Sequence, residues 1–152
     1  MNPKRSFGRS CPLLASAIFS LLLSLPMPAS AQELANSVVG SWKLLSHTVS
    51  VAGTTFDSHA ALLQQRPCAS KIRYVLGADA TYRLDASASD CDEKYRSMQQ
   101  KLYAKTKWKL EGNKLTTSST NFAAGQTYTV SVSGNRMTWN GTEGQGVLVF
   151  ER

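Results

Sequence analysis

The sequence predicts an all-β protein, an up-and-down antiparallel barrel of eight strands that follows a cleaved leader. Short runs alternate between apolar and polar residues with a period of two, as strands with one buried face do. Turn signals recur between these runs, and Gly112-Asn113 and Gly134-Asn135 are typical of tight hairpins. Consecutive hairpins give an up-and-down sheet, and closing it into a barrel removes exposed edges. A two-sheet sandwich is the alternative.

The alternation is clearest in the second half of the chain. In 106–110 we expect Trp108 and Leu110 to face the core while the lysines between them face water. The range 128–133 repeats the pattern. Further strands are expected at 42–51, 71–76, 81–84, 114–117, 136–139 and 147–152.

Residues 1–31 have the three-part pattern of a secretory signal peptide. Three cations and no acid precede or flank the start of an apolar run at 11–25, and Ala29-Ser30-Ala31 supplies small residues for cleavage before Gln32. The run is shorter than the roughly 20 residues that span a bilayer. We therefore expect export to the periplasm or the medium, no membrane anchor after cleavage, and one barrel domain over 32–152.

The formal charge of +7 overstates how basic the barrel is. The chain has 17 basic and 10 acidic residues, and removal of the leader leaves 14 against 10, a net charge of +4. That charge is ordinary for a small domain and does not indicate a nucleic-acid partner. We interpret a series of lysines as the solvated face of a hairpin, with contact to anionic lipid headgroups as the alternative; they are Lys101, Lys105, Lys107, Lys109 and Lys114.

Two cysteines remain after the leader, Cys68 and Cys91. An even pair in an exported chain predicts one disulfide. A zinc site is the rival interpretation, but His47 and His59 lie upstream without the spacing of zinc ligands. We expect no metal and no cofactor.

Several short motifs resemble a known family when taken in order. Gly40-Ser41-Trp42 resembles the Gly-x-Trp opening of the lipocalins and of the bacterial lipocalin-like domain. The later features match the bacterial group; these features are Cys68, the turn and aromatic at 77–82, Cys91, Trp108-Lys109-Leu110, Gly112-Asn113 and the terminal Phe150-Glu151-Arg152. The resemblance covers residues 38–152.

The resemblance implies a barrel floor closed by a tryptophan and an arginine. By this analogy Gly40 and Trp42 are structural residues at the start of the first strand, and Arg152 stacks on the Trp42 indole. The resemblance also implies that a small hydrophobic or amphipathic molecule, or a lipid, is the partner. We expect a monomer.

Inward-facing aromatic residues are the candidate ligand-binding residues, because aromatic walls with a few polar tips describe a small-molecule site. They are Tyr74, Tyr82, Trp108, Tyr128 and Trp139.

We expect no catalysis, since the chain has no Gly-x-Ser-x-Gly elbow, and His47 and His59 are interpreted as solvent-facing or hydrogen-bonded.

The alternative function is a protein-interaction module acting through the outer surface or the segment 53–66, which is expected to be a loop with a helical turn at 58–65. The segment 86–100 is expected to be a second loop, and its acids at 90–93 a solvated turn rather than a calcium site. An enzyme with an unseen site at the barrel mouth is the third possibility.

Overall fold

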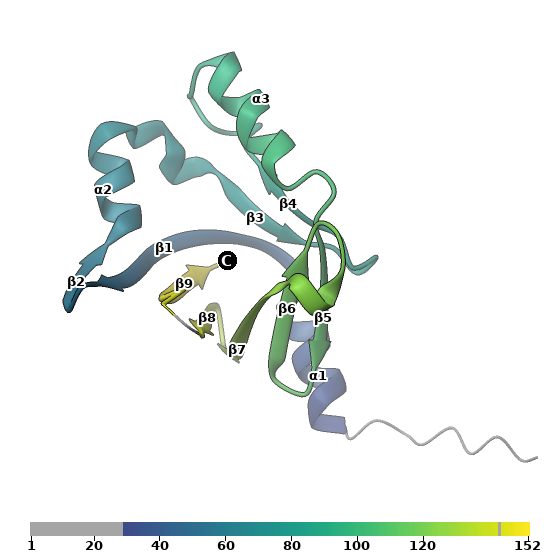
Figure 1. Cartoon of the computed structure of the whole chain (residues 1–152). Coiled ribbons are helices and arrows are strands. Elements are labelled where there is room, and N and C mark those ends of the chain that lie inside the picture. The colour runs from purple at the N-terminus through teal and green to yellow at the C-terminus, as the bar shows by residue number, and fades with distance from the viewer. Residues whose placement is uncertain (1–28, 143) are drawn as a thin grey trace, which may run out of the picture.

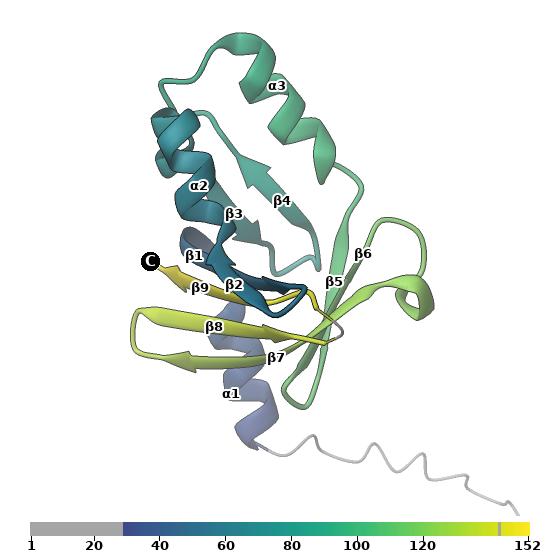
Figure 2. The same cartoon turned by 60° about the vertical axis from the view of Figure 1, so that its left-hand side comes forward.

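The strands form one antiparallel sheet that curls into a nearly closed barrel (Figures 1 and 2). The computed structural model describes residues 29–142 and 144–152. The strand order is β4-β3-β1-β9-β8-β7-β6-β5, and β2 pairs with β1 beside this path. The strands are β1 (Gly40–Val51), β2 (Thr54–Asp57), β3 (Arg73–Leu76), β4 (Tyr82–Asp85), β5 (Lys107–Glu111), β6 (Lys114–Ser118), β7 (Gln126–Ser133), β8 (Arg136–Gly141) and β9 (Val147–Glu151).

The eight strands of the path lie where the alternation predicts them. Both Gly-Asn turns close two-residue hairpins, because Glu111 pairs with Lys114 and Ser133 pairs with Arg136. Since the described strands belong to one sheet, the sandwich alternative is wrong. The short strand β2 was not predicted, because it lies in the segment that was expected to be a loop.

Strand β1 is long enough to bend around the barrel. Its first residues pair with β3 and its last with β2, while β9 runs along its other edge. The register with β9 shifts between Leu44 and Ser46, which indicates a bulge. A bulge increases local twist and lets a strand curve.

The barrel is closed between β4 and β5 by very few contacts. Thr81 and Lys107 form an isolated bridge, and the backbone N–H of Trp108 donates to the Ala80 carbonyl at 2.9 Å. The Trp108 indole N–H adds a bond to the Gly77 carbonyl at 3.0 Å. A Cβ on Gly77 would overlap Asp79 Oδ1 and Thr81 Oγ1, so any other residue there would displace these two side chains of the turn.

Within residues 29–142 and 144–152, three α-helices accompany the sheet: α1 (Ala29–Val38), α2 (Ser58–Gln65) and α3 (Glu93–Leu102). Two 3₁₀ helices complete the regular elements, η1 (Pro67–Lys71) and η2 (Phe122–Ala124). The predicted helix at 58–65 is confirmed as α2. The loop expected at 86–100 was wrong, because α3 occupies most of its second half.

The predicted signal peptide lies outside the described residues except for Ala29-Ser30-Ala31, which form the start of α1. Among the helices of the described ranges, none combines the length and the apolar character that crossing a bilayer requires.

The predicted disulfide is confirmed, because Cys68 and Cys91 are bonded. Cys68 lies in η1, directly before β3, and Cys91 follows β4 and precedes α3. The bond therefore joins the two open ends of the β3–β4 hairpin.

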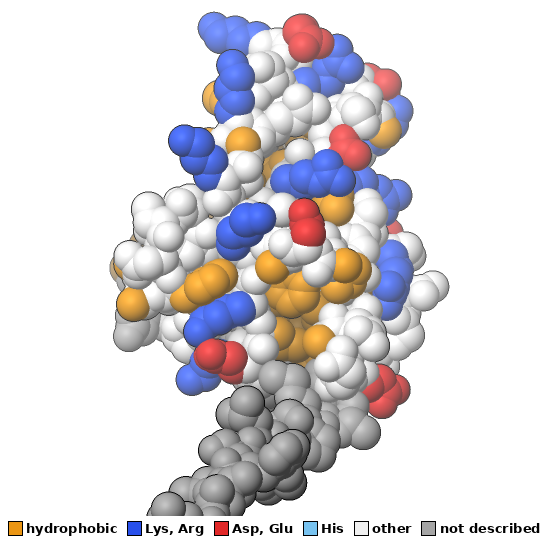
Figure 3. All heavy atoms as spheres, turned by 90° about the vertical axis from the view of Figure 1, so that its right-hand side faces the viewer, with side chains coloured by type: hydrophobic (Ala, Val, Ile, Leu, Met, Phe, Trp, Pro, Cys, Tyr) orange, Lys and Arg blue, Asp and Glu red, His pale blue; other side chains and the backbone are white. Residues whose placement is uncertain are grey.

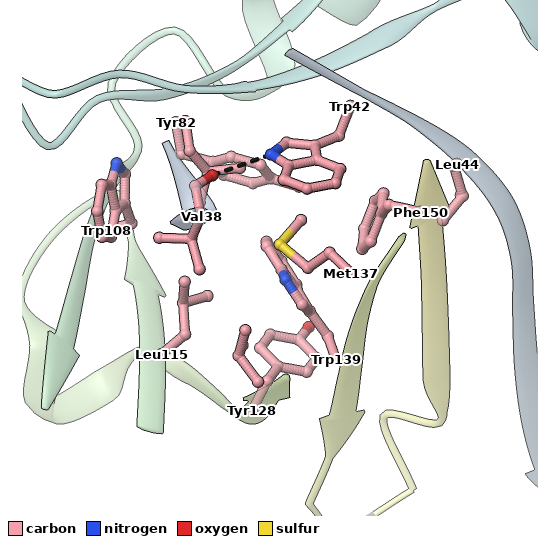
Figure 4. Packing of buried hydrophobic residues seen from close by; sticks show 12 residues of the cluster. Val38, Trp42, Leu44, Tyr82, Trp108, Leu115, Tyr128, Met137, Trp139 and Phe150 are labelled. Carbon is pink, nitrogen blue, oxygen red and sulfur yellow. Dashed lines mark hydrogen bonds between the residues drawn. The ribbon is translucent and has the colours of Figure 1, made fainter. Parts of the chain in front are cut away.

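The floor of the barrel is built around Trp42, which is fully buried. Its indole N–H donates to the Val38 carbonyl at the end of α1 at 2.9 Å (Figure 4). The Arg152 guanidinium lies 4.4 Å from the centre of the indole and also donates to the Ser37 carbonyl at 3.1 Å. Gly40 has a φ of +145°, which side chains rarely adopt, so the strand begins with glycine for conformational reasons. These contacts join α1, β1 and the C-terminus.

Substitutions of the two floor residues, Trp42 and Arg152, should destabilise the protein by different amounts. We expect Trp42→Ala to lower the free energy of unfolding by about 3–5 kcal/mol, as a large buried aromatic is lost. Arg152→Ala should cost about 0.5–2 kcal/mol, the range of a cation–π contact. Urea unfolding followed by circular dichroism measures both, with the exposed Arg136→Ala as control. Unchanged unfolding of both floor variants would contradict this account.

Candidate ligand-binding cavity

A cavity of about 350 Å³ occupies the end of the barrel away from the Trp42 floor. Its walls come from β1, β3, β4, β6, β7, β8 and β9, from the turn before β9, and from the residue after α3. The lining residues are Leu44, His47, Val49, Tyr74, Tyr82, Tyr103, Thr117, Gln126, Tyr128, Trp139, Gly144, Gln145 and Leu148.

Four of the five candidate aromatic residues line this cavity: Tyr74, Tyr82, Tyr128 and Trp139. They come from four different strands, so only the closed sheet brings them together. Trp108 is not part of the lining. Its indole is buried at the β4–β5 junction, where it holds the Gly77 turn.

The lower part of the barrel is filled by aromatic packing (Figure 4). The ring of Trp139 lies 5.0 Å from that of Phe150 and 5.2 Å from that of Tyr128, centre to centre. Tyr82 lies 5.8 Å from Trp139 on the other side. Trp139 therefore separates the solid floor from the hollow above it.

Three tyrosine hydroxyls of the cavity, those of Tyr74, Tyr82 and Tyr128, stay protonated over a wide pH range. Burial raises the pKa of Tyr74, and burial followed by the neighbouring tyrosines raises the pKa of Tyr82 well above its usual value. Burial also raises the pKa of Tyr128, whose hydroxyl donates to Gln126 Oε1 at 3.2 Å. These shifts share one cause, an interior of low polarity that disfavours charge.

Two buried polar atoms of lining residues have no hydrogen-bond partner within the described part of the chain: Trp139 Nε1 and Gln145 Oε1. Native proteins contain few such groups, because leaving one unmet costs about 1–3 kcal/mol. Both atoms are therefore available to a polar group inside the cavity.

His47 fixes the rim of the cavity. Its Nε2 lies 2.9 Å from the Gln145 carbonyl, which can only accept, so Nε2 carries a proton. Its Nδ1 lies 3.0 Å from the Ser58 hydroxyl oxygen, and the single proton of that hydroxyl is shared between Nδ1 and the His47 carbonyl, which lies 3.1 Å away. The imidazole thus connects β1, α2 and the turn before β9, as the hydrogen-bonded histidine that the sequence suggested.

Asp57 holds α2 against the rim. One carboxylate oxygen accepts the backbone N–H groups of His47, His59 and Ala60 at 3.1, 2.9 and 3.1 Å. Burial opposes ionisation of this carboxyl, but the three N–H bonds outweigh it and hold its pKa below 3.8. The neighbouring His59 is buried, and burial lowers its pKa.

Tyr103 is the main lining residue that the sequence did not indicate. It follows α3, in a region expected to be surface loop, and its ring meets that of Tyr82 edge-on at 5.1 Å. The alternation of strands could not find it, because it lies outside any strand. An amphipathic pattern across 93–103 was the available signal.

A second hollow of about 610 Å³ lies outside the barrel between β4 and α3, and it is open to solvent. Asp79, Arg83 and Asp85 contribute to its walls. It is larger than the barrel cavity, but its charged and water-exposed walls lack the aromatic enclosure of a small-molecule site. We therefore treat the barrel cavity as the candidate site.

The fold and the cavity together define a class of protein. An antiparallel barrel of eight strands has room for side chains or for one small ligand, and this one is filled at the floor and hollow at the other end. The chain belongs to the lipocalin-like domain family, whose family model matches residues 38–139. Comparisons with curated proteins and with solved structures gave no match.

The cap on α2 leads to a pH-dependent prediction. Because the pKa of Asp57 is lower in the folded than in the unfolded state, its stabilisation is present above the unfolded value and disappears as the pH falls through the folded one. We expect Asp57→Ala to lower the free energy of unfolding by about 1–2 kcal/mol at neutral pH. Urea unfolding should show this difference shrinking below pH 3.8.

Asp57→Asn is the matched control, because the amide keeps an acceptor at the cap without the charge. Its smaller loss should vary less with pH. An Asp57→Ala deficit of the same size at acidic and at neutral pH would show that the carboxylate charge does not matter.

Proposed function

We propose that the protein binds a small hydrophobic or amphipathic molecule in the barrel cavity and does not transform it. The observation that supports this is the cavity of about 350 Å³, lined by aromatic and aliphatic side chains with a few polar tips. This volume is at the small end of the range for ligand sites. The lipocalin-like fold points to the same kind of function.

Affinity would come from burial of the ligand against the aromatic walls, at roughly 25 cal/mol per Å² of apolar surface. Orientation would come from neutral hydroxyls, because the raised pKa values of Tyr74 and Tyr82 keep them as donors. An oxygen acceptor on the ligand suits such donors.

The absence of catalysis is part of the proposal, and the rim geometry supports it. His47 and Ser58 lie 3.0 Å apart, as a base and a nucleophile would. However, the first N–H groups of α2 beside Ser58 already donate to Asp57, so they are not free to stabilise an oxyanion. The negative charge of the Asp57 carboxylate beside Ser58 would also repel an oxyanion.

Filling part of the cavity should weaken ligand binding. We expect Leu148→Trp, which adds bulk inside the barrel, to weaken binding of a fatty acid or a retinoid at least about tenfold, because overpacking costs 1–3 kcal/mol. Quenching of tryptophan emission measures affinity, and native mass spectrometry detects any co-purified molecule.

Val147→Trp is the matched control, because Val147 is the preceding residue of β9 and is exposed rather than part of the lining. It should bind as the native protein does. A native protein that carries no molecule and responds to neither fatty acids nor retinoids would overturn the proposed function.

A specific observation also favours the second candidate, a protein-interaction module. Val51, Phe56 and Leu62 are exposed apolar residues, and all three lie within or beside the segment 53–66. Exposed apolar side chains that gather in one region can mark a partner site. If the cavity proves empty, this segment is the next candidate.

Export is a further part of the proposal. It is supported by the signal-peptide pattern of residues 1–31 and by the Cys68–Cys91 disulfide, since such bonds persist in oxidising compartments. Cleavage before Gln32 would remove the first three residues of α1 and keep the Val38 carbonyl that binds Trp42.

Expression in a bacterium with a secretory pathway tests export and oxidation together. We expect the exported protein to have the mass of residues 32–152 and, when unfolded without reductant, to show no reactive thiol. A periplasmic or secreted protein with an intact N-terminus would contradict the cleavage site. Two reactive thiols would contradict the disulfide.

A further inference from the structure

The outer face of α3 carries exposed apolar side chains bordered by lysines. Met98 is 48% exposed and Leu102 is 60% exposed. They lie one helical turn apart, and Lys94 and Lys101 fall on the same face by their spacing. All four line one shallow surface groove. The barrel cavity does not account for this surface.

The charge of this face is positive because the acids near it are neutralised elsewhere. In the described ranges, Lys94 and Lys101 take part in no ion pair. Lys105, just beyond the helix, is likewise exposed and without an ion pair there. The three nearby acids pair with cations off this face: Asp90 with Lys71, Asp92 with Arg66 and Glu93 with Arg96.

The shape of this region is a projecting ridge. Helix α3 lies at the end of the molecule opposite α1 (Figures 1 and 2), and Lys and Arg side chains are spread over the side shown in Figure 3, with α3 at the top. A lipid interface accommodates such a ridge, since lysine stems extend toward the headgroups while apolar side chains enter below them.

The ridge also adjoins the barrel cavity. Leu102 lines a hollow of about 220 Å³ together with Tyr103, Thr117 and Gln126. The last three residues also line the barrel cavity. The exposed apolar face and the interior are therefore separated by one layer of side chains.

We propose that α3 docks by this face on the surface of an anionic lipid bilayer. Met98 and Leu102 enter the interface, and Lys94, Lys101 and Lys105 meet the lipid charges. The contact is weak and reversible, because two apolar side chains and three cations are few for a membrane anchor. Passage of a ligand from the bilayer to the cavity would rest on the proposed function, but the docking itself does not.

The test uses the full chain with a reporter on α3, and all variants keep the same segment before Ala29, so that any contribution of that segment is the same in each comparison. Cys11→Ser removes the cysteine outside the disulfide, and Ser97→Cys, within the same groove as Met98 and Leu102, carries an environment-sensitive fluorophore. Vesicles of equimolar phosphatidylcholine and phosphatidylglycerol are compared with vesicles of phosphatidylcholine alone. No ligand is added, so failure here is distinct from failure of the proposed function.

We expect the fluorophore emission to shift to the blue with the anionic vesicles and to stay unchanged with the neutral ones. Lys94→Gln with Lys101→Gln should weaken vesicle binding about 30-fold, since each lysine near an anionic surface contributes about fivefold. Met98→Ser with Leu102→Ser should weaken it at least about tenfold. Lys114→Gln with Val147→Ser removes exposed residues elsewhere and should change nothing.

Several results would overturn the proposal: no emission shift with either vesicle, an equal shift with both, or unchanged binding after both pairs of α3 substitutions. A stronger response to soluble polyglutamate than to vesicles would show an acidic protein as the occupant. Dimerisation that the Met98 and Leu102 substitutions abolish would show a second copy of the chain instead.

Discussion

The junction between β4 and β5 is the constraint on which the rest of the barrel depends. One bridge, Thr81 to Lys107, closes the sheet, and Trp108 reinforces it with a backbone bond to Ala80 and an indole bond to Gly77. Beyond the bridge the two strands separate, and the chain between them forms α3. Since the barrel is joined near its floor and open toward α3, its interior can be solid at one end and hollow at the other.

The same low polarity governs stability and binding in this interior. It raises the pKa of Tyr82 and makes an unmet polar atom such as Trp139 Nε1 costly, and it makes the cavity favourable for an apolar molecule. The packing of Trp139 on Phe150 and the cover of the Trp42 floor compensate for that cost. A protein optimised for stability alone would fill the cavity with side chains.

The sequence was most informative where one physical signal decides the structure. Gly112 and Gly134 adopt positive φ angles that side chains rarely adopt, so both hairpins could be predicted from their Gly-Asn pairs. Helix α3 was missed, because its segment is largely polar, its amphipathic pattern is weak beside such turn signals, and the helix depends on the Asp92 cap and on contacts from other elements. Tyr103 was missed for the same reason. Trp108 was expected in the cavity because the alternation of a strand shows which side chains face the barrel interior. It does not show how far along the barrel such a side chain lies.

The disulfide is structurally important because the junction between β4 and β5 is incomplete. The β3–β4 hairpin is fastened at its turn by Trp108, which binds Gly77, and at its open ends by the Cys68–Cys91 bond. Strand β4 is thus held at both ends, although β5 bridges it at one point in the described chain. Because Cys91 directly precedes the Asp92 cap, the bond also fixes where α3 begins. In the chain-entropy account, closing this loop contributes about 3 kcal/mol, and here that constraint falls on the edge strand and on the helix beside the cavity.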